Sequence, residues 1–143
     1  MSDQALWVAT RKGLFRFAGD TASPKLEHAT FLGENLSLVH VDPRDGAVYA
    51  ALDTGHFGPK LQRSDDGGAT FTEIGLPQYP PMPEGWEEQP QFDGKPITWN
   101  LRMIWALAHG GLDQPGRMWL GSLPGGLFRS DDRGATWQLV ESL

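Results

Sequence analysis

The chain has no cysteine among its 143 residues. Without cysteine it has no disulfide bonds and no thiolate ligands for a metal ion. Two of its histidines, His40 and His109, also lack the spacing of a metal site. We therefore expect no bound metal and no cofactor. A chain of this length is nevertheless large enough to form a hydrophobic core as a single domain.

Long apolar runs are missing as well. No segment approaches the ~18–20 consecutive apolar residues that span a membrane. The first residues, MSDQALWVATRKG, contain neither the apolar region nor the cleavage site of a signal peptide. The net charge of −6 argues against a surface that binds nucleic acid or an anionic membrane. These absences predict a cytoplasmic protein that has no nucleic-acid partner and no membrane partner.

The composition also disfavours long helices, because 18 glycines and 11 prolines together make 29 residues. What the chain does contain is an internal repeat. Residues 61–71 read LQRSDDGGATF and residues 127–137 read LFRSDDRGATW, with eight of eleven positions identical. Internal repeats of this kind are typical of folds built from stacked, similar units.

The two copies share the pattern S-x-D-x-G-x-T-[WF]. It is formed by Ser64, Asp66, Gly68, Thr70 and Phe71, and again by Ser130, Asp132, Gly134, Thr136 and Trp137. In a tight hairpin, Ser and Asp side chains can accept hydrogen bonds from backbone N–H groups, and Gly can adopt a positive φ. Thr suits the first position of the departing strand, and the aromatic residue can pack beneath the turn. A calcium loop would need alternating ligands and a distal Glu, which do not follow here. We therefore interpret the motif as structural.

The repeat extends beyond the hairpin. Short apolar segments at 48–52 and 118–122 align with each other, and a third, decayed copy at 6–10 lacks the hairpin motif. Each unit is predicted to be a four-stranded antiparallel sheet, the size of a propeller blade. We expect one all-β partial propeller over 1–143. Its parts are an incomplete blade lacking its inner strand (1–34), two blades (35–76 and 99–143) and a proline-rich insertion loop (77–98).

The two motifs resemble the Asp-box, or BNR repeat, of sialidases and sortilin-type receptors. The chain as a whole resembles the N-terminal part of bacterial exo-α-sialidase-like, BNR-repeat glycosyl hydrolase-like (sortilin/YVTN-like) proteins. The resemblance implies a β-propeller, which takes four to eight blades to close. About three blades would therefore be a fragment of a larger propeller, or a part that closes the ring by self-association.

The resemblance also suggests where a ligand would bind. The loops between the second and third strands of each blade share one face with the loops between blades, whereas the Asp-box turns lie at the opposite end. The candidate ligand-binding residues on the loop face are Arg11, Lys12, His56, Lys60 and Trp86. Charged residues at turns and glycine-flanked histidines could bind a small anion or a carbohydrate. Each is equally compatible with an ordinary solvated turn or a loop that covers a blade.

The leading functional hypothesis is a propeller-type binding or scaffold module of unassigned ligand. The alternative is a sialidase-like glycoside hydrolase whose remaining catalytic residues lie in absent blades, and a purely structural assembly module is a third possibility. Sialidase chemistry needs an arginine cluster, a tyrosine nucleophile and carboxylates. The chain offers Arg16 without the family's Ile-Pro, and its tyrosines are Tyr49 and Tyr79. The sequence therefore leaves the catalytic residues unassigned and favours no enzymatic activity for this chain alone; if it is an enzyme, the resemblance implies an exo-sialidase-like glycoside hydrolase.

Overall fold

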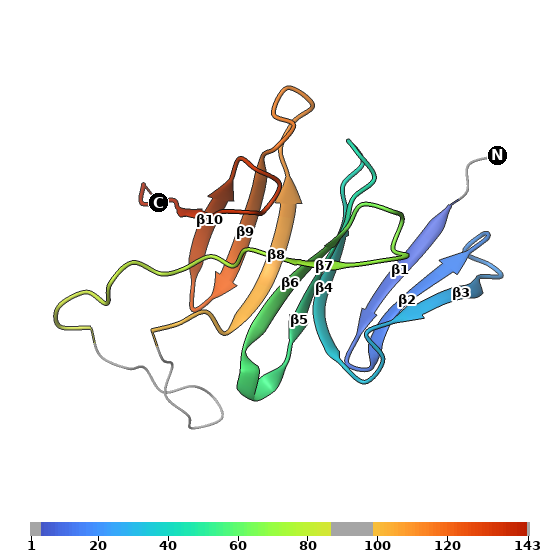
Figure 1. The fold of residues 1–143 in the computed structure, drawn as a ribbon, viewed down its shortest axis with the longest axis horizontal. Coiled ribbons are helices and arrows are strands. Elements are labelled where there is room, and N and C mark those ends of the chain that lie inside the picture. The colour runs from blue at the N-terminus through green and yellow to red at the C-terminus, as the bar shows by residue number, and fades with distance from the viewer. Residues whose placement is uncertain (1–3, 87–98, 143) are drawn as a thin grey trace. The chain divides into compact units, whose positions relative to one another are not determined.

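The structure is a computed structural model that describes residues 4–86 and 99–142. The chain is all-β and forms three antiparallel sheets (Figure 1). It divides into two compact units, Met1–Ile74 and Gly75–Leu143. The predicted insertion at 77–98 is described only as far as residue 86, and residues 87–98 lie outside the described residues.

The first unit contains two sheets. The sheet nearer the N-terminus has three strands in the order β1-β2-β3: β1 (Ala5–Thr10), β2 (Gly13–Ala18) and β3 (Lys25–Thr30). The second has four strands in the order β4-β5-β6-β7: β4 (Asn35–Val41), β5 (Val48–Asp53), β6 (Pro59–Ser64) and β7 (Thr72–Ile74). A single 3₁₀ turn, η1 (Gly55–Phe57), lies between β5 and β6.

The second unit contains one sheet of four strands. Their order is β11-β10-β9-β8, with β8 (Met103–His109), β9 (Met118–Leu123), β10 (Gly126–Ser130) and β11 (Gln138–Leu139). The last strand, β11, has only two residues. Thr70 and Thr136 precede β7 and β11 rather than begin them, because both side chains belong to the hairpin turns.

The registers of the three sheets coincide. In each central hairpin an aromatic residue lies opposite an arginine, and the pairs are Trp7–Arg16, Tyr49–Arg63 and Trp119–Arg129. This register makes β1 the equivalent of β5 and β9. The first sheet therefore has the second, third and fourth strands of a blade, and the prediction that its inner strand is missing is confirmed.

The inner strands of the two complete sheets share a further detail. β4 shifts register against β5 between Leu36 and Leu38, and β8 shifts against β9 between Ile104 and Ala106. The shift falls at the same place, because Leu36 pairs with Leu52 and Ile104 pairs with its equivalent, Ser122. An extra residue in one strand is a β-bulge, which bends and twists the strand locally. The bulge is thus part of the repeat.

The core of the first unit lies between its two sheets. Four buried residues form its centre, and partly buried aromatic and aliphatic residues pack around them: Leu14, Leu36, Ala50 and Leu52 at the centre, with Trp7, Ala9, Phe31, Val39 and Phe71 around it. Each fully buried leucine contributes roughly 1.5–3 kcal/mol by leaving water. The aromatic residue of the first repeat motif, Phe71, lies edge-on to Phe31, with ring centroids 5.0 Å apart. The hairpin of the second sheet is thereby anchored in the core shared with the first.

Candidate functional site

The first repeat hairpin, residues 64–71, is closed by a network of side-chain hydrogen bonds. The Ser64 hydroxyl accepts a bond of 2.8 Å from the Gly68 N–H and donates one of 2.7 Å to the Asp66 carboxylate. That carboxylate accepts the Thr70 N–H at 2.8 Å and the Thr70 hydroxyl as well. Ser64 is fully buried, so its hydroxyl ties the turn to the end of β6.

The second hairpin repeats this network atom for atom. The Ser130 hydroxyl accepts from the Gly134 N–H at 2.8 Å and donates to Asp132 at 2.7 Å. Asp132 accepts the Thr136 N–H at 2.8 Å and its hydroxyl. Trp137 adds a bond of 2.9 Å from its indole N–H to the Gly75 carbonyl. Two separate hairpins thus have the same geometry because they share the motif.

These bonds determine the ionisation of the two aspartates. The hydrogen bonds from the Thr70 hydroxyl and N–H, with that from Ser64, lower the pKa of Asp66 from 3.8 to about 2. Burial acts to raise the pKa of Asp132, but its bonds from Thr136 and Ser130 outweigh this effect and the pKa is lowered. Both carboxylates are therefore ionised at neutral pH and engaged within their own turns.

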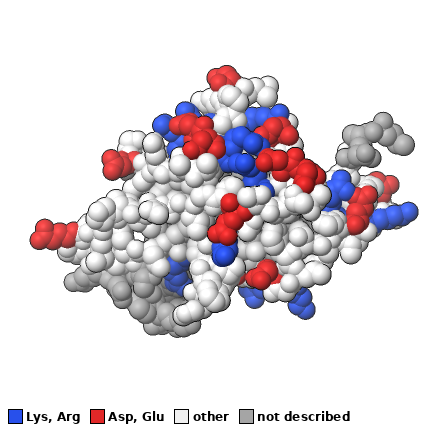
Figure 2. Space-filling model, viewed as in Figure 1, with Lys and Arg blue, Asp and Glu red and all other residues white. Residues whose placement is uncertain are grey.

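The serine and aspartate side chains of the repeated motif thus form hydrogen bonds within their own hairpins. In residues 4–86 and 99–142, no group of three or more His, Cys, Asp or Glu side chains is arranged to hold a metal ion. Lysines and arginines are interspersed with aspartates and glutamates over the face shown in Figure 2. In the described part of the chain, no helix is both long enough and apolar enough to span a membrane.

The opposite end of the first unit contains four of the five predicted ligand-binding residues, Arg11, Lys12, His56 and Lys60. Because the strands are antiparallel, the β1–β2, β3–β4 and β5–β6 loops lie at the same end of the two sheets (Figure 1). Arg11 and Lys12 form the β1–β2 turn, and the Lys12 carbonyl accepts a bond of 3.0 Å from the Gly33 N–H in the β3–β4 loop. Both side chains are exposed and, within the described residues, have neither an ion pair nor a hydrogen bond. The turn is thus ordered by its backbone while both cations remain available.

The β5–β6 loop presents His56 and Phe57. Both belong to η1, where Asp53 accepts the Gly55 N–H at 3.1 Å and the Thr54 hydroxyl donates to the Gly58 carbonyl at 2.5 Å. The His56 ring is exposed and lies edge-on to Phe57, which is 82% exposed. Sequence reasoning missed Phe57. The available signal was a large apolar residue between glycines with no periodic apolar partner.

Lys60 and Trp86 have other surroundings. The Lys60 ammonium lies 3.6 Å from the Glu73 carboxylate on β7, so it is paired within its own sheet. Trp86 belongs to the second unit, where it packs against Trp99 with ring centroids 5.1 Å apart. Trp99 in turn contacts Tyr79 at 5.5 Å and donates its indole N–H to the Pro80 carbonyl at 2.8 Å. These rings form an aromatic cluster within the second unit.

The residues considered for sialidase chemistry serve the packing of the sheets. Arg16 forms an ion pair with Glu27 and lies over the Trp7 ring. Tyr49 is fully buried. The Tyr79 hydroxyl shares a bond of 2.8 Å with the Ser122 hydroxyl and donates to the Pro124 carbonyl at 2.6 Å. Burial raises the pKa of Tyr79, against the opposing bond to Ser122.

Comparison with known proteins identifies the fold and no sequence family. No protein-family model and no curated protein matches the chain. Among solved structures, the chain is similar to a β-propeller protein described as YCF48 bound to D1 peptide, with a TM-score of 0.57 and 15% sequence identity. The match covers 96% of this chain and 36% of that one. The chain is thus a partial β-propeller that spans about a third of the structure it resembles.

Proposed function

We propose that this chain is part of an Asp-box propeller that acts as a binding module, with its three sheets as consecutive blades of one domain. The fold likeness supports the propeller, and the two identical hydrogen-bond networks support the Asp-box type. These networks engage the carboxylates of the motif. The ligand is therefore expected to bind at the end of the sheets opposite the Asp-box turns.

The proposed ligand is an acidic peptide that binds at the loop end of the first unit. The observation that carries this proposal is the pair Arg11 and Lys12, whose side chains are unpaired on a backbone-ordered turn of a chain with net charge −6. Guanidinium and ammonium groups bind carboxylates, and exposed aromatic rings such as that of Phe57 bind apolar side chains. The similar YCF48 structure contains a bound peptide, which is consistent with this ligand class.

Fluorescent peptides that differ only in carrying Glu, Gln or Lys at alternate positions, with a Phe between, test the proposal. We expect the Glu peptide to bind most tightly, with an affinity that falls as salt is added. Lys12→Gln should weaken it by about tenfold, which is the loss of roughly one charge-assisted contact. The matched control is Lys25→Gln, because Lys25 is an exposed lysine at the other end of the same sheet. Equal binding of the three peptides, or an equal loss in both variants, would refute the proposal.

Sialidase-like glycoside hydrolysis is the alternative function, and the motif resemblance is its only support. A fluorogenic sialoside tests it on the same preparations, and carbohydrate binding without turnover is measured with a glycan array. Turnover abolished by substitution of an acidic residue would replace the binding proposal. Self-association that completes a ring is the corresponding proposal for assembly. A monomer in sedimentation velocity at high concentration would exclude it.

A further inference from the structure

The inner edge of β1 has no strand beside it. Among the described residues β1 pairs only with β2, whereas the equivalent strands β5 and β9 are paired on both edges. A strand edge of this kind presents N–H and C=O groups that can pair with another chain. The first sheet is therefore incomplete on the side where the two other sheets have their inner strands.

Burial at one position shows the effect of this missing strand. Leu6 lies opposite Phe17 in β2, as Val48 lies opposite Ser64 and Met118 opposite Ser130. Val48 is 2% exposed and Met118 is fully buried, but Leu6 is 48% exposed. The inner strand contributes to the cover of both buried residues, because Val41 lies opposite Val48 and His109 opposite Met118. Leu6 lacks this neighbour.

The two edges of the first sheet differ in chemistry. The outer edge, β3, has the sequence KLEHAT, and its charged and polar side chains protect an exposed strand from pairing. The inner edge, β1, has the sequence ALWVAT, with no charge, no proline and no bulge. Natural sheets protect exposed edges with such features, so their absence from β1 indicates an edge that is paired when the protein functions.

The complete sheets define the strand that would fit. In both, an aliphatic residue is followed by the extra residue of the bulge and then by two aliphatic residues, in the segments Leu36–Val39 and Ile104–Leu107, counting Ala106 as aliphatic. We propose that the inner edge of β1 binds an extended, uncharged aliphatic peptide strand in antiparallel orientation. One aliphatic residue pairs with Thr10, the bulge follows, and the next two pair with Ala9 and Val8. This site is separate from the proposed acidic-peptide site.

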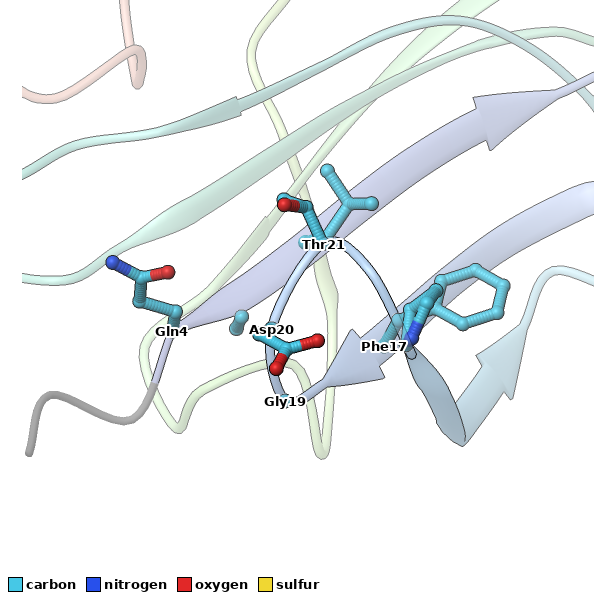
Figure 3. A pocket seen from close by; sticks show the side chains of 8 residues that line it. Gln4, Phe17, Gly19, Asp20 and Thr21 are labelled. Atoms are coloured by element: carbon cyan, nitrogen blue, oxygen red, sulfur yellow. The ribbon is translucent and has the colours of Figure 1, made fainter.

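The far end of such a strand would reach a cavity. An antiparallel strand that begins at Thr10 runs towards Leu6, and Leu6 lines an open cavity of about 230 Å³ together with Gln4, Phe17 and the β2–β3 loop (Figure 3). Its lining is mainly apolar near β1 and β2, with Asp20 and Thr21 at the loop (Figure 3). The cavity can therefore receive the last side chain of the bound strand.

A synthetic peptide with the sequence of residues 35–41, NLSLVHV, serves as the probe for binding to the full chain. Fluorescence polarisation should detect binding that changes little with salt, unlike binding of the Glu peptide. Alternate backbone N–H groups of a strand face its partner. N-methylation of one alternating set should therefore weaken binding by about tenfold or more, and methylation of the other set should weaken it much less. Omission of the serine at the bulge should also weaken it, because the register is then lost.

Two exposed leucines supply matched variants of the chain. Leu6→Glu should abolish peptide binding, whereas Leu26→Glu, at an exposed site on β3, should leave it unchanged. Leu6→Glu also distinguishes β1 from β5, since a peptide that displaced β4 would still bind this variant. Circular dichroism checks that both variants fold. Equal effects of the two methylated sets, or of the two leucine variants, would overturn the proposal. A dimer that the peptide does not dissociate would instead assign the edge to a second copy.

Discussion

The outer hairpins of the complete sheets differ from the outer hairpin of the first sheet in how side chains bind the backbone N–H groups of the turn. Between β6 and β7, the buried Ser64 hydroxyl draws the turn back onto the strand. Between β2 and β3, Phe17 occupies the position of that serine, and Asp20 alone organises the turn by accepting N–H bonds from Ala22 at 3.1 Å and Ser23 at 2.8 Å. The serine hairpins are closed onto the sheet by a buried hydroxyl, whereas the first hairpin is held by an exposed aspartate.

This difference shows what the motif contributes. Its hydroxyl and carboxylate replace the hydrogen bonds that a tight turn removes from the ladder. The Ser64 and Ser130 hydroxyls do so from buried positions, and the Asp66 and Asp132 carboxylates do so from exposed ones. A phenylalanine at the serine position cannot accept an N–H, so the first hairpin uses an exposed aspartate instead. Two substitutions and one pH dependence test this comparison, in order from the largest expected effect to the smallest.

The largest effect is expected for Gly68→Ala. Gly68 has a φ of +93°, and a Cβ there would lie 2.2 Å from the Trp7 ring. Backbone strain and the steric overlap should together lower the free energy of unfolding by about 3 kcal/mol or more, measured by urea denaturation. Gly67→Ala is the control, because Gly67 also has a positive φ but nothing within 4 Å of its Cβ. It should cost only about 1 kcal/mol. Equal losses would show that contact with Trp7 is unimportant.

An intermediate effect is expected from acid. The pKa of Asp66 is about 2 in the folded hairpin, below the ordinary value of 3.8 for an aspartate, so the folded state favours the charged form. Its contribution to stability is complete above pH 3.8 and is lost as the pH falls towards 2. The profile of unfolding free energy against pH should thus be flatter between pH 4 and 2 in the double variant Asp66→Asn, Asp132→Asn. Glu73→Gln controls for the loss of a negative charge. If this variant flattens the pH profile of the unfolding free energy equally, the hairpin hydrogen bonds are not the cause of the acid dependence.

The smallest effect is expected for Asp20→Ala in the first hairpin. Its two hydrogen bonds lie in an exposed loop, where water can replace them, so the loss should be about 0.5 kcal/mol. Asp66→Ala should destabilise the chain more in the same urea assay, because its carboxylate accepts three hydrogen bonds from two other residues of the turn, Ser64 and Thr70. A loss for Asp20→Ala equal to that for Asp66→Ala would mean that the two kinds of hairpin are equivalent in energy.

The sheets could be predicted from the sequence because each copy of the repeat is a short contiguous segment with its own strand and turn residues. The strands, the hairpins and the incomplete first sheet follow from segments that align with each other, and the structure has them where predicted. The candidate site was less predictable. Arg11, Lys12 and His56 occupy exposed loops, but Lys60 pairs with Glu73 across strands, which depends on register rather than on residue type. Phe57 and the packing of Trp86 on Trp99 depend on loop conformation, for which the sequence has no periodic signal.

The contact between Trp7 and Gly68 has a consequence for how the first unit opens. The indole ring of Trp7 in the first sheet lies against Gly68 in the β6–β7 hairpin of the second sheet. If this hairpin moves away from the first sheet, the Trp7 ring is exposed to water. The two sheets of this unit are therefore expected to unfold as one cooperative segment, with the amide protons of β1 and of the 65–71 turn exchanging at similar rates. Gly68, which has no side chain, thus couples the unfolding of the two sheets.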